Sequence, residues 1–161
     1  MALFQASLLV RRNPEVTFAF VSDFRHATTW DPRTYEATKL TEGPIGLGTR
    51  FMLRGGLFPN DTRVCGVTLP RVLLGEQRLP YEIVVHQPSR ELALAGETNT
   101  LRYHDHLQFS PEGPDTRLLY TARIELKGLL KVGEPLSRWM FDRIATAATL
   151  GIPDAVVRGT R

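Results

Sequence analysis

Residues 101–126 have the sequence LRYHDHLQFSPEGPDTRLLYTARIEL, and this stretch decides the fold. Apolar and polar side chains alternate on both sides of the turn sequence Pro111-Glu112-Gly113-Pro114, which is typical of two paired antiparallel strands. Beyond them the period changes, because from Leu136 onward apolar residues recur every three or four positions, as on one face of a helix. The sequence therefore predicts a hairpin that leads into a long C-terminal helix.

Most of the chain before this hairpin also has the pattern of strands separated by Gly, Pro, Asn or Asp turn signals. The expected strands span 3–12, 34–41, 48–55, 64–69, 80–87, 91–97, 100–110 and 116–127. After the first strand, Asn13 and Pro14 begin a helical pattern that continues to Phe24. A second short helical piece, from Arg25 to Trp30, ends at Asp31-Pro32.

One C-terminal helix cannot cover both faces of so large a sheet. We therefore expect an α+β architecture, in which a curved antiparallel sheet of about seven strands wraps around residues 135–150 and the two short helices close one edge. Gly151-Ile152-Pro153 should kink or end the long helix, with one further turn from Asp154 to Val157. The space between helix and sheet predicts an apolar chamber, a usual place for a small ligand.

The composition predicts a single domain over residues 1–161, with 42% hydrophobic and 23% charged residues. The net charge of +3 arises after Glu125, and the arginines are scattered, which argues against nucleic-acid binding. Cys65 is the single cysteine and excludes an internal disulfide. The uncharged run 1–10 is followed by Arg11-Arg12, whereas a signal peptide has its positive region first. The uncharged run 144–153 is too short to span a bilayer, so we expect a soluble, cytoplasmic protein. Oligomeric state is left open.

Three segments in order resemble a known family: NPEVTFAFVSDFRHATTWDP at 13–32, TEGPIGLGTRF at 41–51 and DTRLLYTARIELKGLL at 115–130. Together they resemble the polyketide cyclase/dehydratase-like branch of the START and birch-pollen-allergen (SRPBCC) superfamily. The resemblance implies a helix-grip fold that binds polyketides, lipids, quinones or sterols, while some members cyclise or dehydrate polyketides. The Trp30-Asp31-Pro32 turn matches a family motif that we interpret as structural. Residues 55–80 exceed the family's hairpin, so we expect an extra strand or a flap there.

Asp105 is the most informative candidate for chemistry, because it interrupts the apolar face formed by Leu101, Tyr103, Leu107 and Phe109. A buried carboxylate is costly unless it is paired or protonated. Asp105 is therefore a chamber acid or base or an anchor for a ligand hydroxyl, or else it pairs with a nearby Arg or Tyr or occupies a solvated strand end. Tyr103 is the second catalytic candidate. The predicted ligand-binding residues are Phe51, Leu53, Tyr81, Ile83, Tyr103, Asp105, Leu107, Tyr120, Trp139 and Met140.

The histidines and the single cysteine are weaker candidates for a functional site. His104 and His106 share the strand face opposite to Asp105, and no motif supplies a third ligand, so we expect a solvated face and no metal site. His26 is either a gate or acid at the chamber entrance or a surface histidine, and Cys65 lacks a nucleophile context. No cofactor motif is present, since Gly46-Leu47-Gly48 lacks the third glycine of a dinucleotide fingerprint.

Three functions follow as hypotheses. The first is binding of a hydrophobic or aromatic small molecule in the chamber. The second is a polyketide cyclase or dehydratase that uses Asp105 for proton transfer, with Tyr103 or Tyr120 polarising a carbonyl. The third is a protein-partner module with a vestigial chamber, which would require an exposed apolar patch.

Overall fold

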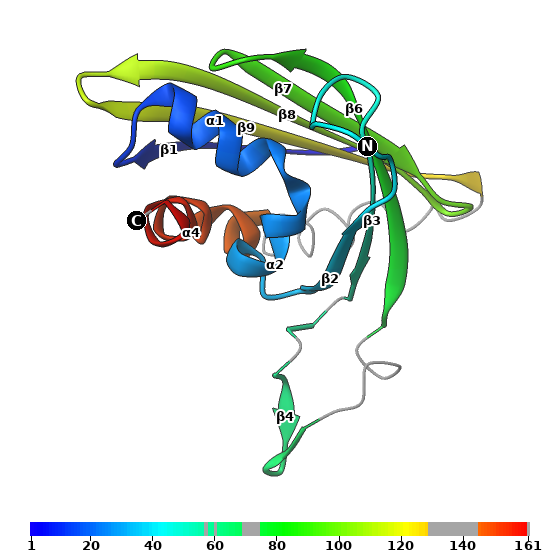
Figure 1. Cartoon of the computed structure of the whole chain (residues 1–161). Helices are drawn as coiled ribbons and strands as arrows, with labels where there is room; N and C mark the ends of the chain where they lie inside the picture. The colour runs from blue at the N-terminus through cyan, green and yellow to red at the C-terminus, as the bar shows by residue number, and fades with distance from the viewer. Residues whose placement is uncertain (57, 60, 69–74, 129–144, 161) are drawn as a thin grey trace.

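Seven strands form one curled antiparallel sheet in the spatial order β1-β9-β8-β7-β6-β3-β2 (Figure 1). The computed structural model describes the chain except for residues 57, 60, 69–74, 129–144 and 161. The strands of this sheet are β1 (Ala2–Val10), β2 (Thr34–Lys39), β3 (Arg50–Gly55), β6 (Gln77–Gln87), β7 (Glu91–Glu97), β8 (Leu101–Glu112) and β9 (Asp115–Leu126). The α+β class and the strand number predicted from the sequence are confirmed.

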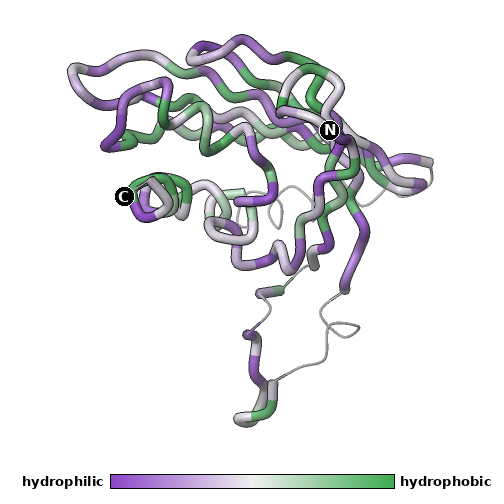
Figure 2. Tube along the Cα trace, viewed as in Figure 1, coloured by the Kyte–Doolittle hydropathy of each residue, from purple (hydrophilic) through white to green (hydrophobic). Residues whose placement is uncertain are grey.

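The strands β6 to β9 form a meander because short turns connect them. Ser89 (φ 60°) and Gly113 (φ 62°) adopt left-handed backbone conformations in two of these turns. In the long β8–β9 hairpin, Asp105 pairs with Ala122 and Tyr103 with Ile124. Hydropathy alternates along the strands (Figure 2), as expected where one face of a sheet is buried.

Three short helical elements follow β1 and enter the hollow of the sheet. They are α1 (Pro14–Ser22), the 3-10 helix η1 (Phe24–His26) and α2 (Ala27–Trp30). Asn13 caps α1, because its Oδ1 accepts the backbone N–H of Val16 at 2.9 Å. The first helix ends two residues before the predicted Phe24, since Asp23 Oδ1 accepts the N–H of Arg25 and starts the next turn.

The C-terminal region is helical over residues 145–150 and again in α4 (Ile152–Gly159). Gly151 lies at the break, and glycine is required there because a Cβ would lie 2.2 Å from the carbonyl oxygen of Trp30. Pro153 occupies the first turn of α4, where its missing N–H is tolerated. The helix is longer at both ends than the single turn predicted for 154–157. The predicted helix residues 135–144 lie outside the described part of the chain.

The prediction of one strand over 64–69 is wrong. Residues 63–68 form a two-stranded hairpin, β4 (Arg63–Val64) paired with β5 (Val67–Thr68), which projects from the main sheet beyond the ends of β3 and β6 (Figure 1). Cys65 (φ 50°) and Gly66 (φ 81°) make the turn. Two consecutive positive φ values are the requirement of a type I′ two-residue hairpin turn, and this turn separates the expected strand into two.

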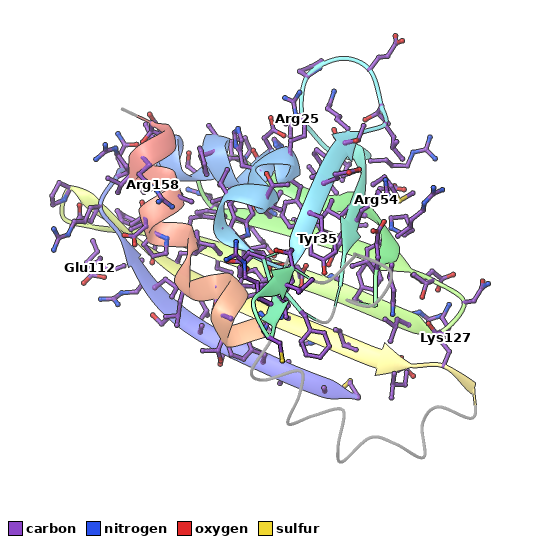
Figure 3. All side chains as sticks on the ribbon, turned by 90° about the horizontal axis from the view of Figure 1, so that it is seen from below. Arg25, Tyr35, Arg54, Glu112, Lys127 and Arg158 are labelled. Carbon is purple, nitrogen blue, oxygen red and sulfur yellow. The ribbon has the colours of Figure 1, made fainter. Side chains whose placement is uncertain are left out.

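The main hydrophobic core lies between the sheet and the helices α1, α2 and α4. Phe18 on α1 packs edge-on against Phe109 on β8, with ring centroids 5.2 Å apart. Ile152 and Val156 of α4 are also buried in this core. Charged side chains occupy its margins: in Figure 3, Glu112 and Lys127 lie at opposite ends of the sheet.

Candidate functional site

A cavity of about 220 Å³ separates the β8–β9 part of the sheet from the helical residues 145–148. The start of β6 and the connection from α2 to β2 complete its wall. Its lining residues are Asp31, Arg33, Thr34, Gly55, Gly56, Gly75, Gln77, Leu79, Tyr81, Leu101, Tyr103, Asp105, Tyr120, Ala122, Ile124, Ala145 and Ala148. The wall therefore combines three tyrosines, two carboxyl groups, one guanidinium and a predominantly apolar remainder.

Asp105 is buried on the cavity side of β8, with 7% of its surface exposed. Burial raises the pKa of its carboxyl from an ordinary 3.8 to about 6, because a charge in this wall loses its hydration. Hydrogen bonding from the hydroxyls of Tyr120 and Tyr81 opposes this rise by stabilising the carboxylate, whereas the charge of Asp31 adds to it. The group therefore changes charge close to neutral pH, where an acid or base is most useful.

The three tyrosines of the wall have two different roles. Burial and the neighbouring Asp105 charge raise the pKa values of Tyr81 and Tyr120 well above the ordinary range, so both remain neutral and direct their hydroxyls to the carboxylate. The hydroxyl of Tyr103 instead donates to the backbone carbonyl of Pro80 at 2.6 Å. Its ring lies over Gly96, where a Cβ would approach it to 2.5 Å. The proton of Tyr103 is thus engaged away from Asp105.

Asp31 is a second carboxylate in the wall, and the sequence interpretation assigned it only to a structural turn. Its Oδ1 accepts the N–H of Arg33 at 2.9 Å and its Oδ2 accepts the hydroxyl of Thr34 at 2.9 Å. Burial nevertheless raises its pKa, against the effect of these two hydrogen bonds. The available signal in the sequence was its position directly after Trp30, because a tryptophan is usually largely buried and its neighbour then lies near the interior.

The predicted ligand-binding residues divide between the cavity and the solid core. Tyr81, Tyr103, Asp105 and Tyr120 line the cavity. Four others lie in the main hydrophobic core, outside the cavity lining: Phe51, Leu53, Ile83 and Leu107. Trp139 and Met140 lie outside the described residues. The binding and catalytic roles of all these residues stay predictions.

The residues that sequence analysis missed are mostly small or lie where the polypeptide changes direction. Gly55 and Gly56 at the end of β3, with Gly75 and Gln77 before and at the start of β6, contribute to the wall. The long 55–80 segment thus reaches the cavity through its two ends, whereas its hairpin extends away from them (Figure 1). Glycines carry no side chain, so no pattern of hydropathy could identify them.

The histidines lie outside the cavity lining. His106 Nε2 lies 2.7 Å from Glu91 Oε1 on the other face of the sheet, and its ring centroid is 6.3 Å from that of His104. Within the described residues, no group of three or more His, Cys, Asp or Glu side chains could hold a metal ion. His26 stacks on Phe20 at 4.2 Å, and its Nδ1 lies 2.9 Å from the Phe20 carbonyl oxygen. Cys65 is exposed.

Comparisons with known proteins agree with this architecture. Residues 1–158 match the family model described as "Polyketide cyclase / dehydrase and lipid transport". A START superfamily protein from Mycobacterium smegmatis has a similar structure, with a TM-score of 0.75, 12% identity and coverage of 98% of this chain and 99% of that one. For a protein from Thermus thermophilus the TM-score is 0.73, with 15% identity and 99% of both chains covered.

A third similar structure is the Zhui aromatase/cyclase from Streptomyces sp. R1128, with a TM-score of 0.66 and 12% identity over 98% of this chain and 92% of that one. At such identities these likenesses establish the fold and nothing about the substrate. No curated protein sequence matches significantly. Across the described residues, no helix has the length and apolar character needed to cross a membrane.

Proposed function

Because the chain belongs to the polyketide cyclase/dehydrase and lipid transport family, we propose that it binds a small hydrophobic or aromatic molecule in this cavity. The observation that carries the proposal is the wall itself. An apolar lining that includes Leu79, Leu101 and Ile124 surrounds a buried carboxylate flanked by tyrosine hydroxyls. A mostly apolar cavity with a few convergent polar groups is the usual form of a small-molecule site.

Ligand screening tests this proposal. Native mass spectrometry and thermal shift against aromatic polyketide analogues, quinones, sterols and fatty acids should reveal a one-to-one adduct that raises the melting temperature. Methyl NMR then locates the ligand, because Ala122, Ala145 and Ala148 line the cavity whereas Ala155 is buried in the main core. Binding that shifts the Ala155 methyl and leaves the three cavity methyls unchanged would place the ligand elsewhere and refute the proposal.

A second candidate is a cyclase or dehydratase, and the specific observation that favours it is the buried position of the Asp105 carboxyl in the cavity wall, where burial raises its pKa to about 6. The Asp105 carboxylate would take a proton from a methylene between two carbonyls, and the resulting enolate carbon would attack another carbonyl of the same chain. The new alkoxide would recover the proton from Asp105 to give an alcohol. Removal of a second α-proton and departure of the hydroxyl as water would complete a dehydration.

The enzyme hypothesis is tested with single substitutions on an identified substrate. Asp105→Asn should lower kcat by about 10²–10⁴-fold, the usual contribution of a positioned acid or base. The Tyr103 proton is held by the Pro80 carbonyl. Tyr120 or Tyr81 could therefore polarise a substrate carbonyl only while Asp105 holds the abstracted proton, because their hydroxyls otherwise donate to its carboxylate. Unchanged turnover in Asp105→Asn would exclude proton transfer by this residue and leave ligand binding as the function.

A further inference from the structure

The hydroxyl groups of the described cavity wall already donate their protons to acceptors within the protein. Thr34 donates its proton to Asp31 and Tyr103 donates its proton to Pro80. The hydroxyls of Tyr81 and Tyr120 are directed to Asp105. Because a hydroxyl has one proton and two lone pairs, each of these four groups has only acceptor capacity left for a ligand.

The carboxylates reinforce this excess of acceptors. Asp105 is ionised above about pH 6, and an ionised carboxylate has acceptor sites only. Two hydroxyls leave part of that capacity unfilled, since a carboxylate offers about four lone-pair sites. Among the described lining residues, the side-chain N–H donors are Arg33 and Gln77, which come from the α2–β2 connection and the start of β6. The wall formed by β8 and β9 around Asp105 therefore accepts hydrogen bonds from a ligand and donates none.

The rest of the wall limits the size and type of the ligand. A volume of about 220 Å³ is smaller than the roughly 300–1,000 Å³ typical of drug-sized sites, which favours a molecule of one or two rings. The rings of Tyr81 and Tyr103, 4.7 Å apart, provide an aromatic surface. The described lining contains two carboxyl groups, Asp31 and Asp105, and one guanidinium, Arg33, so a negatively charged ligand is disfavoured.

We infer that the ligand is a small, neutral aromatic phenol or enol whose hydroxyl donates to the Asp105 carboxylate. This inference rests on the proposed ligand-binding function and adds the chemical class. A ketone in the same place would set its oxygen against acceptors and leave the carboxylate without a new donor. A methyl ether would fill the space with no proton to give. An aromatic or aliphatic carboxylate would add a third negative charge.

Matched naphthalene derivatives test the inference with the unmodified protein. Isothermal titration near neutral pH should show that 2-naphthol binds roughly 10- to 100-fold more tightly than 2-methoxynaphthalene, as expected for a hydrogen bond to a charged group. The ketone 2-acetylnaphthalene should bind no better than the ether, and 2-naphthoate should bind most weakly. Equal affinities for naphthol and ether, or a preference for the ketone, would overturn the inference and leave the proposed function intact.

If no member of the series or of the wider screen binds, the proposed function fails and the inference fails with it.

Substitution of Asp105 identifies the group responsible for the preference for naphthol over its ether. In Asp105→Asn the amide adds N–H donors, so the naphthol-to-ether ratio should fall to within about threefold and the ketone should gain affinity. The matched control is His104→Asn, one residue away on the opposite strand face, which should keep the wild-type ratio.

A second variant covers the case in which Asp105→Asn does not fold. Tyr120→Phe removes one hydroxyl that competes for the carboxylate, so the preference for naphthol over its ether should be kept or increased. A preference lost in Tyr120→Phe and kept in Asp105→Asn would assign the ligand's hydroxyl to the tyrosine and contradict the inference.

Discussion

The concave side of the sheet has a solid half and a hollow half, and the same two strands contribute to both. In the solid half, Leu107 and Leu118 are fully buried against the core that includes Ile152 and Val156 of α4. In the hollow half, the cavity is lined by residues of β8 that come before Leu107, by residues of β9 that come after Leu118, and by Ala145 and Ala148. Among the described residues of the C-terminal helical region, those that line the hollow, Ala145 and Ala148, are small, and Ile152 and Val156 in the solid core are larger.

Polar groups also differ between the two halves. In the solid half, the buried Thr116 hydroxyl donates to the Arg12 carbonyl at 2.7 Å and lies 3.3 Å from the Thr17 hydroxyl, so neutral groups satisfy one another. In the hollow half, burial raises the pKa values of both Asp31 and Asp105. The solid half therefore stabilises the fold, whereas the hollow half holds groups that are costly to bury, as is common at functional sites.

The largest expected effect comes from truncating one leucine in each half of the same strand. Leu107→Ala should lower the free energy of unfolding by about 2–5 kcal/mol, because Leu107 is fully buried and the packed core cannot fill the space. Leu101→Ala should lower the free energy of unfolding by about 1 kcal/mol or less, since Leu101 already borders a cavity and is partly exposed. Urea unfolding of both variants measures the difference. Equal losses would mean that the two halves do not differ in packing.

The next effect concerns the cost of the buried charge. A folded pKa of about 6 against an ordinary 3.8 corresponds to about 3 kcal/mol at about 1.36 kcal/mol per pKa unit. Since the folded protein holds this proton more tightly than the unfolded chain, the contribution of Asp105 to stability falls as pH rises from about 4 to about 6. The free energy of unfolding of Asp105→Asn should therefore exceed that of the wild type by up to about 3 kcal/mol above pH 7 and by little below pH 4.

Unfolding of wild type and Asp105→Asn across this pH range measures that gain as a difference, so carboxylates common to both proteins largely cancel. Asp23 is one of them, and its pKa is lowered in the folded protein. Asp115→Asn, at the half-buried first residue of β9 and outside the cavity lining, is the charge-matched control against which the difference at Asp105 is compared. A constant difference between wild type and Asp105→Asn would show that Asp105 titrates near its ordinary pKa.

The period of the strands allowed the fold and the orientation of Asp105 to be predicted. Successive side chains of a strand point to opposite faces, so the alternation in 101–126 turned Asp105 inward and His106 outward, as the structure has them. Membership of the expected family is confirmed over residues 1–158. These features depend on local periodicity and on the order of motifs, which are both written in the sequence.

The division into a solid and a hollow half could not be predicted in the same way. Ile83 and Tyr81 lie two residues apart on the same face of β6, yet Ile83 lies in the core and Tyr81 borders the cavity. Which of them meets a large side chain depends on the helix placed opposite, a long-range relation that alternation does not contain. Asp31 was missed because a turn motif explained its presence without reference to the cavity.

The smallest expected change in stability comes from filling the hollow half. Ala148→Leu adds three carbons to a residue that lines the cavity of about 220 Å³, so the free energy of unfolding should change by less than about 1 kcal/mol. Ligand affinity should fall at least tenfold, because the added side chain occupies the binding space. Ala147→Leu is the control: it makes the same change on the neighbouring residue, which is not part of the cavity lining. Titration of both variants with 2-naphthol separates occupancy of the cavity from a general effect on the helix, and equal affinities would mean that the ligand does not bind between the helix and β9.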